Sequence, residues 1–317
     1  MTLRKHRNLH RRRIAATVLI MAALLTGCGG KNAQQTEPDE PIEMALAWST
    51  PVPPAATRPP LPGTAATPEP DMIFDNSGNI TLSGSYQAKF SEQTYSFGHA
   101  PRVLIYHTHA REAYREETTP APNSTATPLP ESGGEMRTTD QTRNVVHLGD
   151  VLAKELQKRG FTVFHDVTDV EEPSLSTAYE RSRKVMASYE NIDIYIDLHR
   201  NAADIRRIQN INDVVQIDGK RAARMFFVVG TGINADSTAG EQANWKDNYA
   251  FALSLNKQLA SVNRQLVKPI RVKQGGYYNQ DLGLSLLAEI GHNANLLTEA
   301  ELTVTYFADA LQAVCTF

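Results

Sequence analysis

The sequence is most informative at Val103-Leu104-Ile105-Tyr106-His107-Thr108-His109-Ala110-Arg111-Glu112, where an apolar run ends in two histidines and a carboxylate. The apolar residues predict a buried strand over residues 103–107. Open α/β sheets place their sites at the carboxyl ends of such strands. A His-x-x-Glu pair there can put an imidazole and a carboxylate on one metal ion, and a catalytic zinc takes three protein ligands plus water. The pattern therefore favours a zinc hydrolase.

Helical and strand patterns alternate along the chain that follows. Apolar periodicity predicts helices over 144–159, 179–189, 248–262 and 298–314, and apolar runs predict strands over 161–164, 192–198, 225–230 and 285–289. This alternation is typical of an α/β fold with helices packed on a mostly parallel sheet. We expect one α/β domain over residues 100–317, with a mostly parallel mixed sheet flanked by helices.

The N-terminal segment has the features of an export signal. Six basic residues precede an apolar stretch over residues 14–25, which is shorter than the roughly 20 residues that a membrane-spanning helix needs. The stretch ends in Leu25-Thr26-Gly27-Cys28, which resembles a bacterial lipobox. We expect residues 1–28 to be a lipoprotein-type signal or membrane anchor in which Cys28 is lipidated. The rest of the chain then lies on the outer face of the cytoplasmic membrane, facing the cell wall; an ordinary signal or an uncleaved anchor is the alternative.

Composition separates the remaining segments. Residues 29–71 are rich in proline and threonine, which favours an extended, disordered linker. Short alternating apolar segments over residues 72–99 predict a small β cover. The only cysteine besides the one in the lipobox is Cys315, so we expect no internal disulfide and place Cys315 in the core on the terminal helix. A net charge of −3 gives no sign of nucleic-acid binding.

A second strand-end histidine supplies the third metal ligand. The predicted strand over 192–198 runs directly into His199, as the first strand runs toward His109. Two parallel strands would bring these histidines to the same edge of the sheet. His107 is still within the apolar run, so we assign the metal to His109 and give His107 a supporting or substrate-binding role. Glu112 is the expected carboxylate ligand, and Asp140, just before the next helix, is the alternative.

A buried carboxylate near the other end of the chain is the expected general base. Glu289 follows an apolar strand, where a carboxylate is costly to bury without a partner. It can take a proton from a water activated by zinc and return it to the leaving amine; pairing with an arginine is the competing interpretation. Arg200, Asn293 and Asn295 are candidates for polarising a substrate carbonyl or binding its amides. A loop that contains Tyr277, Tyr278 and Asn279 follows two glycines and is expected beside the cleft.

Three motifs occur in a fixed order: Tyr106-His107-Thr108-His109-x-x-Glu112, Asp197-Leu198-His199-Arg200 and Glu289-Ile290-Gly291-x-Asn293. Further similarity runs through Asn144-Val145-Val146, Arg181-Ser182-Arg183-Lys184, Phe227-Val228-Val229-Gly230 and Asn244-Trp245-Lys246-Asp247-Asn248. Together they resemble the stage II sporulation protein P family, cell-wall hydrolases of endospore-forming bacteria, over residues 100 to 314.

The resemblance implies a zinc amidase fold of the phosphorylase/hydrolase-like type and N-acetylmuramoyl-L-alanine amidase activity on peptidoglycan, with an accompanying endopeptidase action. It also implies a role in forespore engulfment, together with a lytic transglycosylase-type protein and a polytopic membrane protein. The more distant zinc carboxypeptidases share the His-x-x-Glu opening, which supports Glu112. In the broader amidase superfamily the carboxylate ligand precedes the following helix, so Asp140 remains the alternative metal ligand.

The chain departs from the family pattern at Asn201, where aspartate is usual, at His292, where a small residue is usual, and in a Pro/Thr-rich insertion after Glu116. Two other functions remain as alternatives. One is a zinc carboxypeptidase or endopeptidase acting on stem peptides, and the other is a non-catalytic wall-binding lipoprotein.

Overall fold

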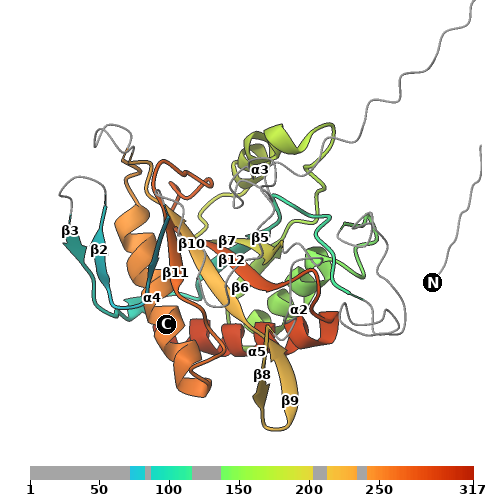
Figure 1. Cartoon of the computed structure of the whole chain (residues 1–317). Helices are drawn as coiled ribbons and strands as arrows, with labels where there is room; N and C mark the ends of the chain where they lie inside the picture. Colours follow the sequence, from blue (N-terminus) through green and yellow to red (C-terminus); the bar gives the residue numbers. More distant parts are fainter. Residues whose placement is uncertain (1–71, 83–86, 116–136, 203–212, 234–240) are drawn as a thin grey trace, which may run out of the picture. The chain divides into compact units, whose positions relative to one another are not determined.

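A seven-stranded mixed sheet organises the computed structural model, which describes residues 72–82, 87–115, 137–202, 213–233 and 241–317 (Figure 1). The strand order is β1 (Met72–Asp75), β11 (Ile270–Lys273), β10 (Met225–Gly230), β12 (Leu284–His292), β7 (Ile194–Asn201), β5 (Arg102–Tyr106) and β6 (Thr162–His165). Four pairings are parallel; β1 with β11 and β10 with β12 are antiparallel. The predicted α/β class with a mostly parallel mixed sheet is confirmed.

Helices cover both faces of the sheet. The face that carries Ile105 and Ile196 packs in one core with α2 (Val145–Lys158), α4 (Trp245–Val262) and α5 (Leu297–Val314). The opposite face carries Leu104 and Tyr195, which pack with Met186 of α3 (Ala178–Met186). A single 3-10 turn, η1 (Leu175–Thr177), leads into α3. Because successive strand residues point to opposite faces, each strand residue can be assigned to the α3 face or to the face of the other three helices.

The three central strands explain the continuous apolar runs of the sequence. Every residue of β10 is buried, and so are all but one residue of β7 and of β12. Parallel strands covered on both faces lose the alternation that marks a half-exposed strand. Most polar residues of these strands are therefore buried as well, and Asp197, His199 and Glu289 among them belong to the candidate site.

Three two-stranded pairs complete the fold. They are β2 (Asn79–Thr81) with β3 (Gln87–Lys89), β8 (Val214–Ile217) with β9 (Lys220–Ala223), and β4 (Tyr95–Ser96) with β13 (Cys315–Thr316). Cys315 is buried as expected, but the prediction that places it on the terminal helix is wrong, because the chain turns extended there and pairs with β4. Within residues 72–99, β2 and β3 form a separate hairpin, whereas β1 is the edge strand of the main sheet.

All described residues lie within the compact unit Ile42–Phe317. The predicted signal with Cys28, the linker over 29–71 and most of the insertion after Glu116 lie outside the described residues. No helix in the described part of the chain has the length and the apolar character that a membrane crossing requires.

Candidate active site

Strand register brings His199 and Glu289 side by side. β12 and β7 run parallel, and Glu289 pairs with His199 across them. Both side chains point to the α3 face. Leu287 lies two residues before Glu289 on β12 and Tyr195 four residues before His199 on β7, and both pack on that face. Residues an even number of positions apart in a strand point to the same face. Two residues 90 positions apart in the chain thus become neighbours at the carboxyl ends of adjacent strands.

His109 and Glu112 reach the same place from the chain that follows β5. β5 pairs with β7 as far as Tyr106 opposite Asp197. The ring centroids of His109 and His199 are 5.2 Å apart and the rings are nearly perpendicular. Glu112 Oε2 lies 3.3 Å from His199 Nδ1 and accepts a hydrogen bond of 2.9 Å from the Arg200 backbone N–H. The structure therefore gathers His109, Glu112, His199 and Glu289, each at most 8% exposed.

Asp197 is a site residue that the role assignments from sequence missed. Its Oδ1 lies 2.9 Å from His199 Nε2 and accepts a hydrogen bond of 2.8 Å from the Thr108 backbone N–H. Its Oδ2 accepts a 2.6 Å bond from the Thr108 hydroxyl. One buried carboxylate thus ties the chain after β5 to the candidate ligand on β7. The signal was the Asp-x-His spacing, which puts both side chains on one face of a strand.

Burial and neighbouring charges set different protonation tendencies in the four residues. Burial and the nearby His199 together lower the pKa of His109 to about 4. Burial also opposes protonation of His199, but Asp197 and Glu112 outweigh it and raise that pKa well above its usual value. Burial, reinforced by the charge of Glu112, raises the pKa of Glu289 to about 7. A carboxyl group with a pKa near neutrality can both accept and release a proton.

The imidazole nitrogens and carboxylate oxygens of this cluster are atom types that bind zinc. His109 Nδ1 and Glu289 Oε2 are buried and have no hydrogen-bond partner, although such atoms are normally partnered in native proteins. Two imidazoles and a carboxylate are a common catalytic zinc set. Among the described residues, no three His, Cys, Asp or Glu side chains are already arranged around one metal position. The imidazole of His199 instead lies between the carboxylates of Glu112 and Asp197, an ion-pair arrangement that a metal would replace, since a metal-bound histidine must be neutral.

The two remaining candidates from the first motif lie apart from this cluster. His107 is buried, with Nδ1 3.0 Å from the Leu198 carbonyl oxygen and Nε2 2.8 Å from His165 Nε2. Both its ring nitrogens are engaged within the fold, which favours a supporting role over contact with substrate. Asp140 is exposed, and its Oδ1 accepts hydrogen bonds from the backbone and hydroxyl of Thr142.

Arg200 fastens the chain beside Glu112. The residue is 2% exposed, and its Nε donates a 2.7 Å hydrogen bond to the Ala113 carbonyl oxygen. Together with its backbone N–H on Glu112, this contact fixes residues 112 and 113 against the end of β7. The placement indicates that Arg200 positions the carboxylate.

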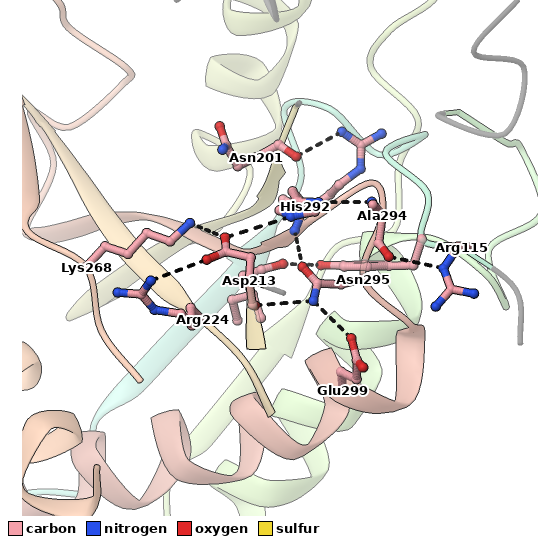
Figure 2. A network of polar contacts seen from close by, with 12 residues as sticks. Arg115, Asn201, Asp213, Arg224, Lys268, His292, Ala294, Asn295 and Glu299 are labelled. Carbon is pink, nitrogen blue, oxygen red and sulfur yellow. Dashed lines mark hydrogen bonds and ion pairs between the residues drawn. The ribbon is translucent and has the colours of Figure 1, made fainter. Parts of the chain in front are cut away.

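The turn after β12 holds the last two candidates (Figure 2). The Asn295 amide accepts from the His292 backbone N–H at 2.9 Å and donates to Glu299 at 2.9 Å, so it shapes the turn. Asn293 is 6% exposed within the same turn. His292 Nδ1 accepts from the Ala294 backbone N–H, and Nε2 is 4.0 Å from the carboxylate of Asp213. The histidine that departs from the family pattern is thus part of the structure of the turn.

Comparison with solved structures finds matches that align with about two thirds of this chain. They include the catalytic domain of the CD27L endolysin targeting Clostridia Difficile (12% identity, 68% of this chain, 99% of that chain, TM-score 0.40). They also include the N-acetylmuramyl-L-alanine amidase Ami1 from Mycobacterium smegmatis (15% identity, 68% of this chain, 94% of that chain, TM-score 0.35). A third is the CwlD amidase from Clostridioides difficile in complex with the GerS lipoprotein (15% identity, 66% of this chain, 94% of that chain, TM-score 0.34).

Family membership comes from the sequence. No curated protein sequence matches the chain. The match to stage II sporulation protein P extends over residues 66–312, which includes every residue of the candidate site and most of the chain. The chain belongs to the stage II sporulation protein P family.

Proposed function

We propose that this chain is a zinc-dependent N-acetylmuramoyl-L-alanine amidase that hydrolyses the amide between the lactyl group of N-acetylmuramic acid and the first L-alanine of the peptidoglycan stem. Membership of the stage II sporulation protein P family supports peptidoglycan as the substrate. The observation that carries the chemistry is the convergence of His109, Glu112, His199 and Glu289 at the ends of neighbouring strands, with unpartnered polar atoms on His109 and Glu289.

Three of these residues would hold the metal. His109 and His199 supply imidazole nitrogens, and Glu112 supplies a carboxylate oxygen that already contacts His199 at 3.3 Å. Zinc, when bound, acts as a Lewis acid on the scissile carbonyl and lowers the pKa of water. Asp197 holds His199 from the other side, as carboxylates commonly do for histidines that bind metals.

Glu289 is the proton carrier. Its Oε2 takes a proton from the attacking water as the water oxygen bonds to the carbonyl carbon. When the C–N bond breaks, the same oxygen delivers that proton to the nitrogen of the leaving L-alanine. A pKa raised to about 7 suits both steps, because neither the ionised nor the protonated form is strongly disfavoured near neutral pH.

Product analysis tests this function directly. The full chain would be incubated with intact peptidoglycan, with and without a chelator, and the soluble products identified by mass spectrometry. Free stem peptides that begin with L-alanine, lost on chelation and restored by zinc, are expected. Shortened or uncross-linked stems still attached to glycan would indicate a carboxypeptidase or endopeptidase instead. Zinc binding without any product would indicate a wall-binding role.

The location and partners of the protein follow from the same proposal. The lipobox at Cys28 and the linker over 29–71 support an enzyme tethered to the outer face of the cytoplasmic membrane with its catalytic domain in the cell wall. Joint action with a lytic transglycosylase-type protein and a polytopic membrane protein during engulfment belongs to this proposal. Globomycin-sensitive labelling of Cys28 with a fatty acid analogue would test the anchor, and an unlabelled, membrane-bound chain would favour an uncleaved helix.

A further inference from the structure

A loop between β11 and β12 adopts an unusual backbone next to the candidate site. Tyr278 and Asn279 are consecutive residues with φ of 50° and 53°. The left-handed region is rare for a bulky residue, and each such residue costs on the order of 1–3 kcal/mol unless its surroundings hold it. The conformation therefore implies that contacts around the loop fix the tyrosine ring where it lies.

Contacts with α3 and β10 hold the loop. Asn279 Nδ2 donates to the Tyr179 carbonyl oxygen at 2.8 Å and to Ser182 Oγ at 2.9 Å, both on α3. At the end of β10 there is no space for a side chain at Gly230, because an added Cβ would lie 2.9 Å from Cδ2 of Tyr278. The tyrosine ring is thus packed on the backbone of β10 and tied to α3 through the next residue.

A hydrogen-bond chain continues from Asn279 to the candidate zinc ligand His199. Ser182 Oγ is 3.0 Å from Thr108 Oγ1, which in turn contacts Asp197 Oδ2 at 2.6 Å. The Ser182 hydroxyl itself donates to the Tyr179 carbonyl oxygen at 3.1 Å. Asp197 then contacts His199 at 2.9 Å. The loop and the site are therefore parts of one polar network.

A row of aromatic rings connects the same two places. The Tyr278 and Tyr179 centroids are 5.8 Å apart in an edge arrangement, and Tyr179 and His109 are 5.9 Å apart in another. Both tyrosines are half-buried. Tyr277 is 53% exposed and is among the few large apolar side chains exposed in the described structure. The rings of Tyr278 and Tyr179 lead toward the candidate zinc ligand His109, and the exposed Tyr277 directly precedes Tyr278 in the same loop.

Two basic residues of α3, the helix that carries Tyr179, are paired with carboxylates. Arg183 on α3 forms an ion pair with Asp281, two residues after Asn279, and Lys184 pairs with Glu180 at 2.9 Å. A pyranose ring has an apolar C–H face with hydroxyls at its rim, which suits a tyrosine, whose ring is apolar and whose tip is polar.

We propose that Tyr278 and Tyr179, extended by Tyr277, form a sugar-binding wall that receives a pyranose ring of the glycan next to the scissile amide. This inference rests on the proposed amidase function for the identity of the sugar. The hydrogen bonds of Asn279 position the wall, and Tyr278 provides the ring surface.

A binding experiment without hydrolysis tests the wall. The ligand is the peptide-free disaccharide of N-acetylglucosamine and N-acetylmuramic acid, titrated into the full chain and followed by NMR line shifts. Replacing Tyr278→Ala should weaken binding at least tenfold, while Tyr278→Phe, which keeps the ring, should bind within about twofold of the parent. Tyr277→Ala should weaken binding as well, and gives a second test at an exposed position that cannot disturb the core.

Tyr306→Ala is the matched control, because Tyr306 lies on α5, which packs on the other face of the sheet. It should leave the affinity unchanged. Equal affinity in the parent, Tyr278→Ala and Tyr277→Ala, or no binding to the parent, would overturn the wall even if the protein releases stem peptides. Conversely, disaccharide binding lost in the tyrosine variants without any amidase product would retain the wall and reject the proposed function.

Discussion

Glu289 combines a buried carboxylate, an unpartnered Oε2 and a raised pKa, the features expected of a general base. Glu289→Gln keeps the size of the side chain but removes its ability to take a proton. We expect zinc content and fold to persist and turnover to fall by roughly 10²–10⁴-fold. Stem-peptide release, metal analysis and circular dichroism would be measured on the same preparation. Turnover within tenfold of the parent, at equal zinc content, would show that another group takes the proton.

The carboxylate ligand can be identified by comparing two single variants. Glu112 is 5% exposed and contacts His199, whereas Asp140 is exposed and bonds to Thr142. We expect Glu112→Ala to lose most of its zinc and Asp140→Ala to keep a full complement, measured by metal analysis after dialysis against zinc-free buffer. The opposite order would assign the metal to Asp140 and would require the chain around residue 140 to move toward His109.

The sequence predicted which candidate residues lie close together, but it could not predict which role each of them has. Strand-end positions predicted that His109 and His199 share one edge of the sheet, which the structure shows, while their roles as ligands stay predictions. The role of Asp197 depends on the pairing of β5 with β7, since its contacts reach Thr108 on another segment. Arg200 and Asn295 looked like groups for substrate because the sequence does not show that the fold already engages them.

At the scale of elements, the end of β12 depends on a glycine. Gly291 has φ of 65°, and an added Cβ would lie 2.8 Å from Asn295 Oδ1 and 3.0 Å from the Ala223 Cβ. Gly98 has the same φ but nothing within 4 Å, so Gly98→Ala isolates the backbone cost. We expect Gly98→Ala to lower the free energy of unfolding by about 1–2 kcal/mol, and Gly291→Ala by about 1–3 kcal/mol more because of crowding. Equal losses in urea denaturation would mean that the turn relaxes around the new methyl group.

Long elements were predictable and short ones were not. The helices expected over 144–159 and 298–314 correspond to α2 and α5, because an apolar stripe repeated over four or five turns is a strong signal. β11 has only four residues and was missed, as was the β8–β9 hairpin. Such strands are stabilised by the neighbours they pair with, and a pairing partner far along the chain cannot be identified from a local pattern.

At the scale of the whole molecule, the sheet carries site residues from both halves of the chain. β5 and β7 come from the first part of the domain, whereas β12 comes after four further strands and a helix. The antiparallel pairing of β10 with β12 is what places β12 beside β7, and no local signal predicted it. A ligand that bridges these strand ends therefore connects segments 90 residues apart, and its binding should raise the free energy of unfolding of the whole domain.

Zinc should accordingly raise the thermal stability of the full chain. A ligand that binds only the folded state at one hundred times its dissociation constant adds about 2.7 kcal/mol. For a domain of this size that corresponds to roughly 5–10 °C in the melting temperature. We expect this shift in thermal melts with and without zinc, its reversal by a chelator, and its loss in His199→Ala. Tyr306→Ala, on α5 away from the site, should keep the full shift. A melting temperature of the parent chain that does not change with zinc would mean that the segment after β5 and the end of β7 do not share a metal ion.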